Sequence, residues 1–423
     1  MAVKALKGFK DVVPGDVETW QFIEGTARDI LHRFGCAEIK TPILEKTKLF
    51  KRSIGETTDI VEKEMYTFAD RNGSSLTLRP EGTASVLRAY IENGLQQVKP
   101  VQKIYTIGPM FRHERPQKGR LRQFHQVSVE VLGTDLPRVD AELMGMAALI
   151  SEELGLSVSL EINSLGCPQC RPAFNAALLE YISTIDDLCE DCVRRRATNP
   201  LRVLDCKNAT CQSHYKDAPS ILDHLCGDCE DHFSAVKADL DRLDVEYTVN
   251  HFMVRGLDYY TRTTFELITG DLGSQSAVGA GGRYDGLVKQ LGGPDVPGIG
   301  CGMGMERLAL LLEQKDEKIT APGLDLFIAA LGPEAQDMGF AMCHELRSAG
   351  LFVAMDYQDR RLKNQMNQAG RAQADFTLIL GEDELEKNTG VLRNMQTREQ
   401  YDVELGGDLA EWAIRLIDQM ETS

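Results

Sequence analysis

The sequence predicts an α+β protein with a β-rich main domain, a small cysteine-rich insertion and a C-terminal α/β domain. Three observations lead to this fold class. Two runs with strand-like alternation flank a polar loop within Tyr105–Gly133, most cysteines gather between Cys167 and Cys229, and apolar strands alternate with helical stretches after Leu324. A chain of 423 residues is also too long for a single hydrophobic core.

Composition and charge narrow the class of protein. A net charge of −17 argues against a nonspecific nucleic-acid binder. It leaves room for a specific RNA partner, because Arg112–Arg122 contains five basic residues and one glutamate. No run of 18 apolar residues occurs, and residues 1–15 lack the apolar core of a signal peptide. We therefore expect a soluble cytoplasmic protein with no membrane partner.

The N-terminal region begins with a predicted amphipathic helix. Apolar residues recur at helical spacing over Asp16–Phe34, and Gly35 is a plausible stop. The following stretch, Glu38–Glu45, contains Pro42 and fits an edge or interface strand better than a central one. Helix and strand either pack on the core or form a dimer interface, and the sequence leaves both readings open.

A short hairpin and a helix are expected next. Tyr66–Asp70 and Leu76–Leu78 are two strand-like runs around the turn signal Arg71–Gly73. Glu81 then precedes the helical run Ala84–Asn93. Its carboxylate is either a helix N-terminal group or part of a binding site.

The segment Tyr105–Gly133 carries the central site prediction. If its two runs pair as an antiparallel hairpin without a bulge, Arg112, Gln126 and Glu130 share one surface. The intervening loop is basic. A polar sheet surface beside such a loop indicates an anionic substrate.

The chain then passes through the insertion and returns to β-rich sequence. Arg138–Leu154 is a predicted helix and Ser157–Ile162 a predicted strand. The composition changes over 163–244, which we assign to the insertion. Phe252–Ile268 contains two strand-like runs around a polar, aromatic centre, and Lys315–Gly323 is a polar linker.

Glycines are dense in Gly273–Gly304, but neither familiar nucleotide motif is present. No GxxxxGK[ST] occurs, and Tyr284 stands where a dinucleotide fingerprint requires its third glycine. Alternate glycines in Gly300–Gly304 allow a flat ring to approach the backbone. Arg307 lies in the first turn of the predicted helix Met305–Gln314, where a cation is disfavoured unless an anion such as phosphate is bound. The alternative is a solvated arginine.

Eight of the eleven cysteines lie in the insertion, and in a reducing compartment such clustering indicates metal ligands. Two Cys-x2-Cys pairs separated by 18 residues fit a structural zinc site. The candidate ligands are Cys167, Cys170, Cys189 and Cys192. A second set is available from Cys206, Cys211, Cys226 and Cys229, with His214, His224 or His232 as substitutes. The alternative is a helical insertion with buried thiols.

Five segments together resemble the bacterial histidyl-tRNA synthetases, which are class II aminoacyl-tRNA synthetases. They read TLRPEGT, GPMFRHERPQKGRLRQFHQ, VRGLDYYTRTTFE, GGRYDGL and GMGMERL, in the family's order over nearly the whole chain. The resemblance implies an antiparallel-sheet catalytic domain at 1–162 and 245–318, interrupted by the insertion, and an anticodon-binding domain at 324–423. It also implies a homodimer that activates L-histidine with ATP and Mg²⁺ and transfers it to histidine tRNA. The family's insertion is usually metal-free, so zinc and free thiols both remain open.

The resemblance also implies a role for each matching residue. Arg112 and Arg255 would be catalytic and meet the ATP α-phosphate, and Arg307 would bind the γ-phosphate. Glu81 with Thr83 would receive the substrate ammonium, and Glu130 would accept a hydrogen bond from its imidazole. Histidine would be bound by Glu81, Thr83, Arg112, Gln126, Glu130, Arg255, Tyr259, Tyr260 and Tyr284. ATP would be bound by Arg112, Glu114 and Arg307. The tRNA acceptor end would contact Gln117 and Arg120, with Gln117 as a candidate base reader.

Two rival functions remain. One is a non-synthetase paralogue, the regulatory subunit of ATP phosphoribosyltransferase, which shares the catalytic fold. Such paralogues typically lack the C-terminal domain and have a degraded VRGLDYY stretch, whereas Arg255 and residues 324–423 are present here. The other is a zinc-dependent RNA-binding module, which would not need the three arginines Arg112, Arg255 and Arg307.

Overall fold

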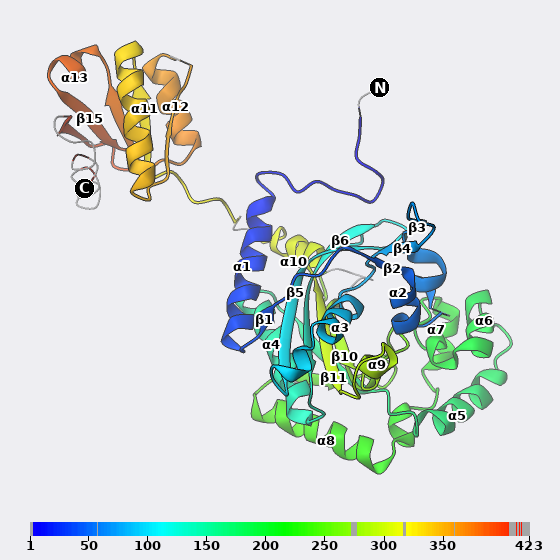
Figure 1. Ribbon diagram of the computed structural model, residues 1–423. Helices are drawn as coiled ribbons and strands as arrows, with labels where there is room; N and C mark the ends of the chain where they lie inside the picture. Colours follow the sequence, from blue (N-terminus) through cyan, green and yellow to red (C-terminus); the bar gives the residue numbers. More distant parts are fainter. Residues whose placement is uncertain are drawn as a thin grey trace. The chain divides into compact units, whose positions relative to one another are not determined.

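The computed structural model describes residues 3–56, 58–271, 277–315, 319–358 and 360–405, together with Trp412, Ile414 and Leu416. The remaining parts of the glycine-rich stretch, the linker and the predicted C-terminal domain lie outside this description. The chain divides into two compact units, residues 1–319 and 320–423 (Figure 1).

Over its described residues, the first unit is built on an eight-stranded, mainly antiparallel sheet (Figure 1). The strand order is β1 (Ala37–Glu38), β5 (Gln102–Phe111), β6 (Gln123–Leu132), β11 (Gly298–Gly304), β10 (Ala277–Arg283), β9 (Thr261–Ile268), β7 (Ser159–Ser164) and β8 (Tyr247–Val249). Only the two edge strands pair in parallel with their neighbours within this sheet. The β5–β6 hairpin has no register shift, which meets the condition set in the sequence argument, so Gly108 lies opposite Gln126 and Ile104 opposite Glu130.

Four helices pack against the sheet and enclose the main core. They are α1 (Val17–Arg33), α4 (Pro137–Glu153), α8 (Gly227–Arg242) and α10 (Met305–Leu312). Strand β6 shows how the sequence separates the two faces. Val127, Val129 and Val131 are buried in this core, so the alternate residues Gln126 and Glu130 lie on the opposite face.

That opposite face is bordered by α3 (Thr83–Glu92), α9 (Leu287–Gln290) and a small three-stranded sheet. The small sheet has the strand order β2 (Leu44–Lys46), β4 (Ser75–Leu78) and β3 (Thr67–Ala69). Along the chain, helix α2 (Thr47–Ile54) and a π-helical turn, Ile60–Glu64, lie between β2 and β3. The predicted β3–β4 hairpin is confirmed.

Two strand predictions are wrong. The single strand expected over 38–45 is divided between β1 and β2, and Pro42, which has no N–H to donate, lies between them. The first run of 252–268 is not a strand, because Met253 turns back to Asn250 and its carbonyl accepts from the Asn163 side chain. This irregular backbone carries the segment 254–260 toward the polar face of the sheet.

The residues between β7 and β8 form four α-helices, α5 (Arg171–Ser183), α6 (Glu190–Thr198), α7 (Ala209–Tyr215) and α8, and two short 3-10 helices, Pro200–Val203 and Ile221–His224. The first three share a separate small core that includes Phe174, Leu178 and Cys192. Helix α8 differs, because Phe233 and Val236 are buried in the main core. The region predicted as an insertion therefore ends in a helix that belongs structurally to the main sheet.

The second unit has the α/β composition that the sequence predicts. Its sheet has the order β13 (Val353–Met355), β12 (Leu326–Ala330), β14 (Phe376–Leu380), β15 (Thr389–Asn394) and β16 (Gln400–Glu404), with helices α11 (Pro333–Ser348), α12 (Leu362–Arg371) and α13 (Glu382–Glu386). The first three strands are parallel and the last two antiparallel. Among all described helices, none is long and apolar enough to cross a membrane.

A buried ion pair joins α4 to β10 and gives a stability prediction. Arg283 and Asp140 are fully buried, with guanidinium and carboxylate 2.8 Å apart, and His232 bonds the same carboxylate at 2.9 Å. Arg283→Ala leaves that charge without its partner, so we expect a loss of about 3–5 kcal/mol in the free energy of unfolding of the first unit.

The measurement is denaturant unfolding followed by Trp20 fluorescence in a Trp412→Phe background, because the two tryptophans lie in different units. The control is Arg242→Ala, which removes an exposed ion pair with Asp239 and should cost under about 1 kcal/mol. Equal losses for both variants would contradict a structural role for the buried pair.

Candidate active site

A cavity of about 290 Å³ opens on the polar face of the main sheet. Its walls come from the β5–β6 hairpin, the start of α3, the segment 255–260 and strands β9–β11. Most of the predicted site residues line it: Glu81, Thr83, Arg112, Glu114, Arg120, Gln126, Arg255, Tyr259, Tyr260 and Arg307.

Glu81 lies at the start of α3 and also faces the cavity. Its carboxylate accepts backbone N–H bonds from Thr83 at 2.7 Å and Ala84 at 2.8 Å, so it caps the N-terminus of α3. The same side chain lines the cavity. Burial raises the pKa of Glu81 above its ordinary value, against these hydrogen bonds and the nearby Arg112, which lower it.

Glu130 is buried behind the cavity wall, where it is hydrogen-bonded to the buried Tyr284 and the partly buried Thr83. Its carboxylate accepts from the Thr83 hydroxyl at 2.6 Å and from the Tyr284 hydroxyl at 2.5 Å. Burial raises the pKa of Glu130 to about 8, although both hydroxyls favour its charged form. Glu130 and Tyr284 thus stand just behind the lining residues, and Thr83 connects them to the open space.

Two adjacent tyrosines form an aromatic part of the wall. The rings of Tyr259 and Tyr260 are 4.6 Å apart, and Tyr284 packs edge-on against Tyr259 with centroids 5.9 Å apart. All three rings are buried, so this part of the cavity suits a flat apolar or aromatic group.

Two of the three predicted arginines are held by contacts with side chains and backbone at the cavity wall. Arg112 donates from Nε to the Pro80 carbonyl at 2.9 Å and lies over the Phe124 ring. Arg255 pairs with Glu266 and lies over the Tyr260 ring. These contacts orient the guanidinium groups before any ligand binds.

Arg307 is held differently, by backbone oxygens. It donates to the carbonyls of Ala277 and Gly119, the latter at 3.4 Å. Burial, and next the positive charge of Arg120, lower the pKa of the Arg307 guanidinium. Glu114 and Glu266 act in the opposite sense and raise this pKa, so Arg307 lies half-buried on the cavity wall among charges of both signs.

The basic loop after β5 is held by contacts of Glu114 and Arg120 at the cavity, and its tip at Gln117 is exposed. Glu114 pairs with Arg120 at 2.5 Å inside the cavity. Gln117 and Arg120 exchange two backbone hydrogen bonds of 3.0 and 2.9 Å across a tight turn. The side chain of Gln117 borders a separate hollow near Trp20 and is outside the main cavity.

Chemically, the cavity combines buried carboxyl and hydroxyl groups with three oriented arginines and a tyrosine wall. Such a site can bind a small cationic or hydrogen-bonding substrate next to a polyphosphate, and it can stabilise negative charge that develops between them.

Two protein-family models match the chain. The model of the histidyl-tRNA synthetase family matches residues 8–308. The chain belongs to the histidyl-tRNA synthetase family. A model of the anticodon binding domain matches residues 325–412. The resemblance, the α+β fold class and the C-terminal domain type predicted from the sequence are thereby confirmed.

Similar proteins agree with this membership. The histidine–tRNA ligase of Desulfotalea psychrophila is 59% identical over 412 residues, covering 97% of this chain and 95% of the relative. That of Geobacter metallireducens is 56% identical, covering 95% and 97%. The crystal structure of apo S. aureus histidyl-tRNA synthetase superposes with a TM-score of 0.81 at 38% identity, covering 97% of this chain and 100% of that one.

The histidyl-tRNA synthetase fold also occurs in a protein that carries the rival name. A Bacillus halodurans structure titled as an ATP phosphoribosyltransferase regulatory subunit/histidyl-tRNA synthetase has a TM-score of 0.64 at 18% identity, covering 90% of this chain. At that identity the likeness concerns the fold alone.

Several site residues were missed from the sequence. Glu266 pairs with Arg255, and Phe124 supports Arg112. Glu266 could have been found because it is a lone carboxylate within the apolar strand run FELI. Phe124 could have been found because it lies on the same strand face as Gln126. Gly300 was seen only as an approach for a flat ring.

Gly300 in fact makes room for Glu130. The two residues lie opposite each other in the β6–β11 pair, and a Cβ on Gly300 would come within 1.9 Å of the Glu130 Oε2 atom. Gly300→Ala should displace this carboxyl group from Thr83 and Tyr284, and we expect KM for histidine to rise about tenfold or more.

The measurement is ATP–pyrophosphate exchange at varied histidine concentration. Gly25→Ala in α1 is the matched control, because a Cβ there meets no atom within 4 Å. An unchanged KM for histidine in Gly300→Ala would show that Glu130 is not held where the substrate binds.

The cysteine assignment requires a correction. The predicted set Cys167, Cys170, Cys189 and Cys192 is not one cluster. The structure divides the eight insertion cysteines into two groups: Cys167, Cys170, Cys226 and Cys229, and Cys189, Cys192, Cys206 and Cys211. Spacing identified the pairs, but the path of α5–α7 decides which pairs meet. The candidate substitutes lie elsewhere: His214 pairs with Asp187, and His232 with Asp140.

Proposed function

We propose that this protein activates L-histidine with ATP to form histidyl-adenylate and pyrophosphate, and then transfers histidine to the 3′ end of histidine tRNA for protein synthesis. The observation that carries the proposal is the single cavity in which three arginines converge beside the buried Glu130 group. Membership of the histidyl-tRNA synthetase family supports the same reaction.

Histidine binds at the end of the cavity where Glu81 and Glu130 lie. Glu81 and Thr83 receive the substrate ammonium, while Arg112 and Gln126 bind near its carboxylate and amine. Glu130 accepts a hydrogen bond from the imidazole, supported by Tyr284, and the Tyr259 and Tyr260 rings enclose the side chain. An isostere without the imidazole N–H would not supply this donor to the buried Glu130, and the lost hydrogen bond gives strong discrimination.

Adenylate formation needs charge neutralisation more than proton transfer. The histidine carboxylate attacks the ATP α-phosphate, so two anions must meet and negative charge develops between them. Arg112 and Arg255 stabilise this charge, Arg307 binds the γ-phosphate, and Glu114 contributes to the ATP site. Mg²⁺ shares the neutralisation of the phosphates when it is bound.

Charging of tRNA tests the proposal as a whole. Purified protein is incubated with ATP, Mg²⁺, labelled histidine and histidine tRNA, and acid-precipitable label is measured. We expect charging that depends on ATP and on histidine. Absence of charging with an active preparation of tRNA would defeat the proposed function and would favour the regulatory paralogue.

The loop His113–Leu121 is assigned to the tRNA acceptor end, with Arg120 on phosphate or sugar and Gln117 as base reader. Gln117 projects from a fixed turn outside the adenylate cavity. Gln117→Ala should therefore slow histidine transfer about tenfold while pyrophosphate exchange changes less than about twofold.

Transfer is measured by single-turnover mixing of preformed enzyme-bound adenylate with tRNA. Gln97→Ala, at another exposed glutamine, is the control and should change neither rate. Equal effects of Gln117→Ala on both steps would count against a role in reading tRNA.

Three further features belong to the proposal: cytoplasmic location, zinc in the cysteine-rich insertion and a homodimer. Support for the dimer is local. Ile43 and Leu44 are large exposed hydrophobic residues, 41% and 39% accessible, on and beside β2, an edge of the small sheet. Light scattering after size exclusion should give twice the chain mass, and Ile43→Lys with Leu44→Lys should give the monomer.

A further inference from the structure

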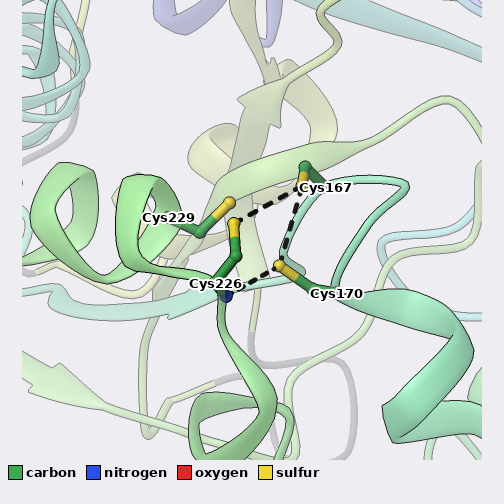
Figure 2. A group of neighbouring side chains, drawn as sticks. All are labelled: Cys167, Cys170, Cys226 and Cys229. Atoms are coloured by element: carbon green, nitrogen blue, oxygen red, sulfur yellow. Dashed lines mark hydrogen bonds between the residues drawn. The ribbon is translucent and has the colours of Figure 1, made fainter.

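The eight insertion cysteines form two compact groups of four sulfurs. In each group all four Sγ atoms lie within 4.8 Å of one another. The base cluster consists of Cys167, Cys170, Cys226 and Cys229, and Figure 2 shows its side chains converging from the loop before α5 and from the start of α8. The distal cluster consists of Cys189, Cys192, Cys206 and Cys211.

The sulfur spacing fits one tetrahedral ion in each cluster. A Zn–S bond of about 2.3 Å places neighbouring sulfurs of a tetrahedron about 3.8 Å apart. In the base cluster the Sγ of Cys167 lies 3.7 Å from that of Cys170 and 3.8 Å from that of Cys226, and in the distal cluster Cys189 and Cys206 are 3.7 Å apart. Disulfide sulfurs would be about 2.05 Å apart. Iron–sulfur clusters spread their cysteines over several irons, which requires wider spacing.

Backbone N–H groups already point at these sulfurs. In the base cluster, Gln169 donates to Cys167 Sγ at 3.4 Å and Cys226 donates to Cys170 Sγ at 3.2 Å. In the distal cluster, the N–H of Cys189 donates to Cys211 Sγ at 3.3 Å. Such donors orient thiolate ligands and disperse their negative charge, so they suit a metal site.

The base cluster fastens the two ends of the insertion together. Cys167 and Cys170 follow strand β7, while Cys226 caps α8, which packs on α4 and the main sheet. Cys226 lies 56 positions after Cys170. An ion bound here closes a long loop, and the free energy of binding becomes free energy of folding for that region.

The base cluster is also continuous with the wall of the histidine cavity. Leu165 and Gly166, just before Cys167, exchange backbone hydrogen bonds of 2.7 and 2.8 Å with Arg262. Arg171, just after Cys170, donates to the Tyr260 carbonyl. Gly166 has a positive φ of 59°, and a Cβ there would meet Cys170 at 2.7 Å, so this turn is shaped for the cysteine pair.

The distal cluster serves a different part of the molecule. It joins α6, α7 and the short turn between them inside the small helical core. The adjoining residues Arg195 and Arg202 pair with Asp59 at 3.3 and 3.7 Å. In addition, Asn199 donates to Asp258 at 2.9 Å. These contacts run between side chains, to Asp59 and Asp258, whereas the base cluster is joined to Tyr260 and Arg262 through hydrogen bonds to backbone oxygens.

We propose that this protein binds two zinc ions, one in each cluster, and that the base-cluster ion is a positioning element for the histidine pocket. The ion would fix the turn between β7 and α5 and, through Arg171, the backbone of Tyr260. The pocket effect rests on the proposed histidine activation, whereas the two metal sites do not.

Zinc content of the full chain tests the sites directly. After exhaustive dialysis against metal-free buffer, we expect about two zinc ions per chain by mass spectrometry of the metals. The double variants Cys226→Ser/Cys229→Ser and Cys206→Ser/Cys211→Ser should each retain about one, and Cys343→Ala, a buried cysteine of the second unit, should retain two.

A measurement on unmodified protein avoids reliance on folded variants. Titration with a mercurial thiol reagent in the presence of a chromogenic zinc indicator should release zinc in proportion to modified cysteines, and cobalt-substituted protein should show tetrahedral thiolate absorption. Protein without zinc that also gives no such cobalt spectrum would overturn the sites. Iron with visible absorption would overturn the choice of zinc.

Exchange kinetics separate the two roles. Loss of the base-cluster ion should raise KM for histidine about tenfold and leave KM for ATP within about twofold, whereas loss of the distal ion should leave both within about twofold. Equal kinetics of the two double variants would refute the positioning role even with two zinc ions present. Failure of the wild-type protein in exchange, with zinc content intact, would count against the proposed function alone.

Discussion

Replacing Arg255 with alanine is expected to lower histidine-dependent ATP–pyrophosphate exchange about a thousandfold, with most of the loss in kcat. Its guanidinium is oriented in advance by Glu266 and by the Tyr260 ring, so it requires no reorganisation when charge develops on the α-phosphate. In a buried cavity this electrostatic contribution exceeds what the same cation gives in water.

Two companion variants distinguish charge from geometry. Arg255→Lys keeps the charge but loses the planar donors, so it should recover only part of the rate. Arg242→Ala, an exposed arginine on α8, should match the wild type. Full exchange in Arg255→Ala would remove this residue from the catalytic account, whatever the other variants do.

The second large effect concerns Glu130, whose replacement by glutamine should impair binding and increase stability. Loss of the carboxyl acceptor for the imidazole is expected to raise KM for histidine about a hundredfold. Burial raises the pKa of Glu130 to about 8, so the folded protein keeps this proton at pH values where the unfolded chain has released it.

The sign of the stability effect follows from this difference in protonation. Between about pH 5 and pH 8 the unfolded chain binds fewer protons at Glu130 than the folded protein, so rising pH destabilises the wild type. Below about pH 4.5 both states are protonated and this effect vanishes. Glutamine does not titrate, so the stability of Glu130→Gln relative to wild type should grow by up to about 1.4 kcal/mol per pH unit in that window.

Thermal unfolding followed at Trp20, in the Trp412→Phe background, measures the difference at pH 5, 6, 7 and 8. Glu246→Gln, at an exposed carboxylate, is the matched control. A difference between Glu130→Gln and wild type that stays constant with pH would contradict the raised pKa. An unchanged KM for histidine would contradict the recognition role.

Local patterns in the sequence predict the polar face of the sheet well, because burial imposes the period-2 alternation on β6. Val127, Val129 and Val131 had to face the helices, so the position of Gln126 and Glu130 followed. The residue roles were different. They came from family resemblance, since no local rule shows that Arg255 and Arg307 approach the same cavity from distant segments.

The failures have a common physical origin in long-range contacts. The cysteine spacing identified four pairs but not their partners, because partner choice depends on where the α5–α7 helices return the chain. From the sequence, Glu266 is a single polar residue in a strand, and only the fold shows that it forms an ion pair with Arg255. Likewise, Gly300 is explained only by the Glu130 side chain on the neighbouring strand.

Histidine-dependent ATP–pyrophosphate exchange by the purified full-length protein tests the central claim most directly, because it reports on the cavity alone and needs no tRNA. With saturating Mg·ATP we expect exchange that requires histidine and is not supported by other amino acids. The control is a cooperative unfolding transition, which shows that the protein is folded. If such protein gives no exchange at saturating histidine, the assignment of this cavity to histidine activation is contradicted.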